Sequence, residues 1–214
     1  MDAERINIYS ACDKAIQAMN RWSLDDFGKL KLADWDDVNV IRTVKAVYTR
    51  GAKRARKRYY EVAFEAYLLA LAMCEIPADK AHRMAEKAIT EKWVDKVLQD
   101  IDFITMYRFD TETERKAYRL AETLEVSNDR DHEINKALRA WSQQLAQYAL
   151  NVTDYAVIEA FEDAGIEEVI WISEKDGREC KACNSYNGKR FRIEDLPRKP
   201  HYGCRCHLVP VLKD

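Results

Sequence analysis

The sequence predicts a mainly α protein with a small α+β C-terminal module. A helical body of about four to five helices covers residues 1–165, and a module with short strands covers residues 166–214. Three observations predict this division. Apolar residues recur at helical spacing up to about residue 165. Most of the glycines and prolines, which disrupt helices, lie at or after Gly165. Four of the six cysteines lie between Trp171 and Pro210.

The composition is that of one domain, or of a domain with an appendage. With 214 residues the chain is long enough to bury a core. Charged residues make up 34% of it, above the roughly 25% of an average domain, yet the net charge is only −2. This balance excludes a protein that is basic over its whole surface. The apolar run Tyr67–Cys74 is far shorter than the about 20 residues that cross a bilayer, so we expect no membrane span.

The sequence of the first half of the body predicts two helices joined by a short loop. The first helix covers about Asp2–Arg21, where apolar residues recur at near-helical spacing, and the loop covers Trp22–Trp35. Asp34 or Asp36 is a suitable N-cap for the second helix, because a short polar side chain can accept a hydrogen bond from the first free N–H groups. The second helix then spans Asp37–Cys74.

Gly51 is a weak point at which the Asp37–Cys74 helix could divide into two. One third of the circumference of this helix is apolar. Six cations and no acid lie between Arg50 and Arg58, and all of them except Arg56 fall on the opposite side of the helix. Such a run is either a solvated face or a docking surface for phosphates or an acidic protein. The candidate contact residues are Arg50, Lys53, Arg54, Lys57 and Arg58.

Three further helices complete the predicted body. Pro77 occupies the first turn of a helix that runs to about Ile104, a position that proline favours. A helix from about Thr111 to Val126 begins with acids, which suit the positive end of the helix dipole. The last helix spans about Asp129–Ala164, and Gly165 is a natural residue to end it.

Closely spaced cysteines and a histidine characterise the C-terminal module. Cys180 and Cys183 form a C-x2-C pair, and His201, Cys204 and Cys206 follow as H-x2-C-x-C. Two-residue gaps allow a tight turn to direct both side chains at one ion, which is how proteins usually hold tetrahedral zinc. We therefore predict one structural zinc ion in a zinc knuckle, with five candidate ligands for four positions. Cys206 shares a strand face with Cys204, so it could replace His201.

Disulfides, or thiols buried as small apolar groups, are the alternative for these cysteines. No apolar signal segment precedes the first charged residues, so nothing directs the chain to an oxidising compartment, and metal is favoured over disulfides. Cys12 and Cys74 stand alone on helical patterns, and we expect them in the core.

Short strands and turns are predicted to present the ligands. A strand covers Ile166–Ile172, a turn at Asp176–Arg178 positions the first cysteine, and a last strand covers about Arg205–Leu212. Asn187 and Gly188 lie between the two ligand groups. This dipeptide favours a two-residue hairpin turn with positive φ at both positions, so we expect a β-hairpin there.

Three runs of this module resemble the signature of phage minor head proteins, the Mu F-like head-morphogenesis family. The runs are W-I-S-E-K-D-G-R-E-C-x-x-C, N-G-K-x-F and L-P-x-K-P-H-x-G-C-R-C. The resemblance is tight over Trp171–Pro210 and looser over the helical runs Glu114–Leu124 and Ala140–Ala149. One departure is local: the family commonly has His-Pro before the final cysteines, and this chain has Pro200-His201-Tyr202-Gly203.

The resemblance implies a structural, low-copy component of a phage head that acts in capsid assembly at the portal, with a further role in DNA packaging or ejection. It also implies a place in the head interior of the virion, and in the host cytoplasm during assembly. The implied partners are the portal and other head proteins, with packaged DNA as a further contact.

Two other classes of function compete with this expectation. In a zinc-dependent DNA-binding module, the knuckle and the basic run would both face nucleic acid. In a zinc nuclease, the metal needs an open position and a nearby base, but the soft ligands here suffice to close the sphere and only His207 is a close base. In a redox catalyst, the C-x2-C pair opens a helix, whereas we expect a hairpin after Cys183. We therefore expect no enzymatic activity.

Overall fold

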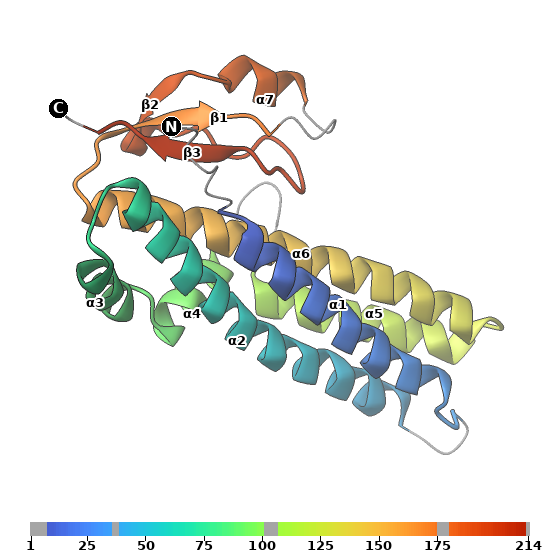
Figure 1. Cartoon of the computed structure of the whole chain (residues 1–214). Coiled ribbons are helices and arrows are strands. Elements are labelled where there is room, and N and C mark those ends of the chain that lie inside the picture. The colour runs from blue at the N-terminus through green and yellow to red at the C-terminus, as the bar shows by residue number, and fades with distance from the viewer. Residues whose placement is uncertain (1–7, 36–38, 101–106, 175–179, 213–214) are drawn as a thin grey trace.

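A computed structural model describes residues 8–35, 39–100, 107–174 and 180–212 of the chain. Long helices form a bundle, and a small antiparallel sheet lies against one end of it (Figure 1). This confirms the mainly α fold with a small α+β end. The body consists of α1 (Ser10–Lys31), α2 (Val40–Met73), α3 (Ala78–Ala88), α4 (Glu91–Gln99), α5 (Phe109–Val126) and α6 (Arg130–Asp163). The C-terminal elements are β1 (Glu168–Ile172), α7 (Lys181–Tyr186), β2 (Arg190–Arg192), a 3-10 turn (Ile193–Asp195) and β3 (His207–Pro210).

Helix α1 extends through most of the segment predicted as a loop. The prediction of a loop over Trp22–Trp35 is wrong, because the buried face of α1 continues through Ser23, Asp26 and Phe27. Two of these residues are polar, so the segment reads as exposed in the sequence, although side chains from α2 cover it. The start predicted at Asp2 lies outside the described residues.

Helix α2 is continuous, and Gly51 does not divide it. Gly51 is buried where α2 meets aromatic rings, and a Cβ there would lie 3.1 Å from Trp141 and 3.3 Å from Trp22. The glycine therefore permits a close approach of the helices. The N-cap is Asn39, whose side chain accepts from the N–H of Arg42 at 2.9 Å, so the prediction of Asp34 or Asp36 is wrong.

The single helix predicted from Pro77 to Ile104 is two helices. Pro77 does precede the first turn, but α3 ends at Ala88 and Ile89 is buried in an extended conformation. Thr90 then starts α4 by accepting from the N–H of Trp93 at 3.1 Å. The apolar spacing continues across this break, which is why the pattern alone reads as one helix. Residues 101–104 lie outside the described ranges.

Helix α6 matches its prediction closely, from its N-cap Asp129 to its end. Gly165 adopts φ +75°, its N–H donates to Glu162 and the N–H of Ile166 donates to Phe161, both at 2.9 Å. These two bonds satisfy the last carbonyls of the helix in a Schellman motif. None of the described helices is long and apolar enough to span a bilayer.

The sheet has the order β2-β1-β3, with both neighbours antiparallel to the central strand β1. The turn at Asn187 and Gly188 is not the one predicted, because only Gly188 has positive φ, at +74°. Asn187 has φ −53° and ψ 125°, and the N–H of Lys189 donates to Tyr186, which defines a type II turn. This turn joins α7 to β2 rather than two strands, and β2 pairs with β1 instead.

The C-terminal module (Glu168–Leu212) lies on α1 and α6. Arg205 pairs with Asp13 of α1, and the hydroxyl of Tyr202 donates to the carbonyl of Gln143 in α6. The backbone N–H of Gly203 donates to the side chain of Gln147 at 2.8 Å. All three contacts come from the segment that carries His201, Cys204 and Cys206. The predicted ligands are therefore placed at the seam between the module and the body.

Candidate metal centre

All five predicted ligands converge on one place in the structure. Cys180 is the N-cap of α7 and Cys183 lies in its first turn, while His201, Cys204 and Cys206 come from the segment before β3. The ligand atoms form two groups, Cys180, Cys183 and His201, and Cys183, Cys204 and Cys206, within each of which they lie within 4.8 Å of one another. This cluster could bind a metal ion.

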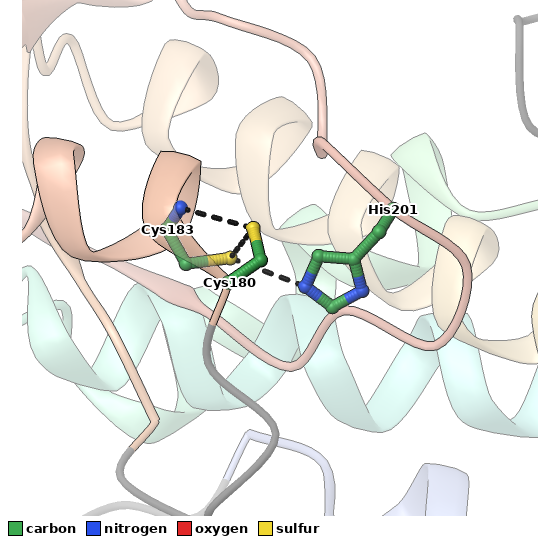
Figure 2. Close-up of side chains that lie close together, drawn as sticks. All are labelled: Cys180, Cys183 and His201. Atoms are coloured by element: carbon green, nitrogen blue, oxygen red, sulfur yellow. Dashed lines mark hydrogen bonds between the residues drawn. The ribbon is translucent and has the colours of Figure 1, made fainter.

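The sulfur of Cys183 is the centre of the cluster. It lies 3.5 Å from the sulfur of Cys180, 3.7 Å from that of Cys204 and 3.2 Å from Nε2 of His201. Figure 2 shows Cys180, Cys183 and His201 directed toward one another. A tetrahedral ion with metal–sulfur bonds of about 2.3 Å and metal–nitrogen bonds of about 2.0 Å separates its ligands by roughly 3.5–3.8 Å. The spacing around Cys183 is close to that of such a site.

The cysteines of the cluster are free thiols in the structure. Their sulfur separations of 3.5 and 3.7 Å are far longer than the roughly 2.05 Å of a disulfide bond. Cys12, predicted in the core, is fully buried in α1, and Cys74 is half-buried.

Cys180 and Cys183 are brought together by the first turn of α7. The backbone of Cys180 is extended, and its sulfur accepts from the N–H of Cys183 at 3.3 Å. We expected a hairpin after Cys183, and that expectation is wrong. The argument against a redox pair therefore fails, since this C-x2-C does open a helix, although one of only six residues.

The thiols differ in how readily they ionise. Burial raises the pKa of Cys183 to about 11, while the hydrogen bond from the Cys183 N–H lowers the pKa of Cys180. The side chain of Cys204 lowers the pKa of Cys206 to about 4, and the same contact raises the pKa of Cys204. The protons are thus shared unequally among sulfurs held close together. Metal binding releases such protons, because the thiolate is the ligand.

Hydrogen bonds around the cluster hold the candidate ligands in place. Ser173, at the end of β1, donates its hydroxyl to the carbonyl of Cys183 at 2.7 Å, and its N–H donates to the side chain of Asn187 at 2.9 Å. His201 lies with Nδ1 3.0 Å from the carbonyl oxygen of Tyr202. A proton on Nδ1 would be donated there, which leaves Nε2 unprotonated and facing Cys183.

A network at the seam, which we call the seam lock, joins Tyr9, Asp154 and Lys199 to the backbone of Cys206. The hydroxyl of Tyr9 lies 2.7 Å from Asp154 and 3.0 Å from the carbonyl oxygen of Cys206. Lys199 donates to Tyr9 at 2.9 Å and to that carbonyl, and lies 3.3 Å from Asp154. Burial raises the pKa of Asp154 against the opposing effect of Lys199. Sequence reasoning missed this network, because Asp154 reads as one more polar residue of a helix.

His207, the base candidate, lies in β3 with Nδ1 3.8 Å from a carboxylate oxygen of Glu174. It also borders a pocket of about 170 Å³ beside the seam lock, whose walls are mostly apolar. The Lys199 ammonium, which lines this pocket, is engaged within the chain by Tyr9, Asp154 and the Cys206 carbonyl.

The sequence around the basic run of α2 suggested that no carboxylate lies near it. The structure differs, because acids contact three of the predicted contact residues. Arg50 and Arg54 both contact Asp26 of α1, at 3.3 and 2.9 Å, and Arg58 pairs with Glu61 at 2.6 Å. Lys53 and Lys57 are exposed and make no ion pair with the described residues. The five predicted contact residues therefore differ: three have acidic partners within the chain, and two have none among the residues described.

The chain was compared with known protein families, curated proteins and solved structures. No protein-family model, no curated protein and no solved structure matches the chain.

Proposed function

We propose that the C-terminal module is closed by one structural zinc ion. The observation that carries the proposal is the convergence of four candidate ligands, Cys180, His201, Cys204 and Cys206, around the sulfur of Cys183. Thiolate and imidazole are ligands that zinc prefers, and a sphere filled by four of them leaves no position for a substrate. The ion would supply folding energy to the module and no chemistry.

Cys183 would be a ligand in every arrangement, because it is the residue that both groups share. Cys204 and Cys206 are buried beside it, whereas Cys180 and His201 are half-buried. The hydrogen bonds of Ser173 and His201 to nearby carbonyls fit this role, since metal ligands are usually oriented by such partners.

On this basis we propose that the protein is a non-catalytic, head-morphogenesis component of a phage virion. Its resemblance to minor head proteins, tight over Trp171–Pro210, supports this function, and the zinc clamp would account for the cysteines and the histidine of that resemblance. The proposed partners are the portal and other head proteins, and the proposed location is the head interior.

Native mass spectrometry with thiol counting tests the zinc clamp. We expect one zinc per chain, lost in Cys183→Ser and retained in Cys74→Ser, a matched change at a cysteine outside the cluster. Protein with no metal and four free thiols in the cluster would contradict the clamp, and so would protein with two intact disulfides. Co-purification with portal and head proteins tests the head assignment separately, because it can fail while zinc is still bound.

A redox function is the second candidate, and one observation favours it. Cys180 caps α7 with its sulfur 3.5 Å from that of Cys183, an arrangement suited to reversible oxidation of the pair. Disulfide-exchange assays on the zinc-loaded protein should give background rates if the sphere is closed. Exchange that disappears in Cys180→Ser would favour the redox function over the clamp.

A further inference from the structure

A groove between α2 and α4, which we call the α2–α4 groove, is lined by cations that the zinc clamp does not use. It has a volume of about 750 Å³, with Arg50, Lys53, Arg54 and Lys57 along α2 and Tyr60 and Val94 farther along. Cations that recur at each turn of a helix lie about 5.4 Å apart along its axis and share one face. The groove therefore presents a row of positive charge.

A single buried carboxylate organises one side of this row. Asp26 is 2% exposed, and its two oxygens face Arg50 at 3.3 Å, Arg54 at 2.9 Å and Lys29 at 3.8 Å. The side chains of Arg50 and Arg54 remain 44% and 48% exposed. Three cations thus share one negative charge that is itself hidden from solvent, so the surface above Asp26 stays positive.

Asp26 also fixes how the two guanidinium groups point. Arg50 contacts it through Nε and Arg54 through Nη1, so each keeps other N–H groups for a ligand. The guanidinium of Arg54 also lies 5.9 Å from the centre of the Trp22 ring. A planar fork held in advance loses less entropy when it binds two oxygens of a phosphate, a geometry that arginine matches well.

The acids that line the groove are mostly paired with cations outside the row. Glu61 is paired with Arg58 at 2.6 Å, and Asp95 with Arg56 at 3.1 Å. Glu91 is the remaining acid that lines the groove. Lys53 and Lys57 have no acidic partner in the described ranges, so their charges are available to a bound anion.

We propose that Arg50, Lys53, Arg54 and Lys57, with the arginines oriented by Asp26, bind the phosphate backbone of single-stranded nucleic acid. Two features favour it over an acidic protein surface. The oriented forks match phosphate oxygens, and Tyr60 lines the same groove with an aromatic ring on which a base can stack. The zinc cluster takes no part, so this binding is independent of the metal and of the head assignment.

Fluorescence anisotropy with a labelled oligothymidine, at several salt concentrations, tests the proposal. Four phosphate contacts predict a slope of log affinity against log salt of about −3, and Lys53→Gln with Lys57→Gln should reduce it to about −1.4. Neither lysine has an ion pair to lose within the described residues, so the fold should persist. Lys80→Gln with Lys87→Gln on α3 removes the same charge and should change nothing. Equal binding of polyglutamate or of duplex DNA, or no effect of the α2 pair, would overturn the proposal.

Asp26→Asn separates orientation from charge. If the groove attracts anions by net charge alone, removing a carboxylate should tighten binding. If Asp26 positions the arginines, we expect binding to weaken about tenfold although the surface becomes more positive. Arg50→Lys with Arg54→Lys keeps both charges, loses the forks and should weaken binding likewise, which preserves the test if Asp26→Asn does not fold. Unchanged or tighter binding by a folded variant would refute the positioning role.

Discussion

The helical body and the C-terminal module are held together by different means. The body has a core of large apolar side chains, in which the ring centroid of Trp141 lies 5.0 Å from that of Tyr48 and 6.3 Å from that of Phe109. The described part of the module buries few apolar side chains, chiefly Val169, Trp171 and Leu208, and three of its cysteines are buried with them. A unit not far above the roughly 40 residues at which metals or disulfides usually become necessary has little apolar area to bury. Apolar burial therefore contributes less to the module than to the body, and the proposed zinc clamp would supply the stabilisation that burial does not.

Removing the metal should have the largest effect, and it should affect the module and the body differently. Structural zinc contributes roughly 10–16 kcal/mol in small zinc-binding peptides, far more than any single side chain here. We expect a chelator, or Cys183→Ser, to unfold Glu168–Leu212 while α2, α5 and α6 stay folded. Hydrogen exchange followed by mass spectrometry would locate the loss of protection.

The structure adds a specific expectation about where that loss stops. Tyr9 and Asp13 contact the module directly, so protection should also fall at the start of α1. Cys74→Ser is the matched control and should change neither region. Uniform loss of protection over the whole chain would mean that body and module form one cooperative unit, which contradicts the comparison.

A substitution in the core of the body should have the second largest effect on stability. This loss of stability should not depend on whether metal is bound. Trp141 is buried between Tyr48 and Phe109, and Trp141→Ala should destabilise the body by about 3–5 kcal/mol through lost burial and the cavity left behind. Thermal unfolding with and without chelator measures this loss. The same decrease under both conditions is expected, and a decrease that appears only with chelator would contradict it.

The seam lock should show how strongly the two regions are coupled. Lys199 contacts Asp154 of the body and the Cys206 carbonyl of the module, so Lys199→Met should cost about 1–3 kcal/mol, discounted because its side chain is 18% exposed. A double-mutant cycle with Asp154→Asn should give an interaction energy of about 1 kcal/mol. Additive effects of the two changes would show that the pair does not join the regions.

Much of the body could be predicted because its helices bury apolar residues at regular spacing. The end of α6 at Gly165 follows from one residue type with one backbone requirement. The features that could not be predicted depend on partners from elsewhere in the chain. Asp26 is buried because Arg50 and Arg54 cover it, and no pattern within α1 reveals this. The break before Thr90 was missed for a related reason, since the buried Ile89 continues the apolar spacing.

The candidate site divides in the same way. The convergence of the five candidate ligands could be predicted, because closely spaced cysteines and histidines are a local signal of metal binding. The groups that position them could not. Gln147 lies on a helix where a polar residue reads as solvent-facing, yet it is buried and accepts from the N–H of Gly203. The helix that Cys180 caps was missed because the Asn187–Gly188 pair favours a hairpin turn. In this chain the pair forms a type II turn after the helix instead.

The smallest expected effect comes from two glycines in the same conformation, one in each region. Gly165 ends α6 with φ +75°, and Gly188 forms the type II turn of the module with φ +74°. A Cβ at either position meets nothing within 4 Å, so substitution by alanine adds backbone strain without a clash. Each change should cost about 1 kcal/mol in the metal-loaded protein.

The consequences of these equal costs should differ between the regions. If folding of the module is coupled to metal binding, the strain of Gly188→Ala is subtracted from the binding free energy, and about 1 kcal/mol should weaken zinc affinity about fivefold. Gly165→Ala strains a helix end that the body stabilises without metal, so zinc affinity should stay unchanged while the thermal midpoint of the body falls slightly. Competition with a chromophoric zinc chelator measures both affinities. Equal affinities for the two variants would show that the module is already folded before it binds the ion.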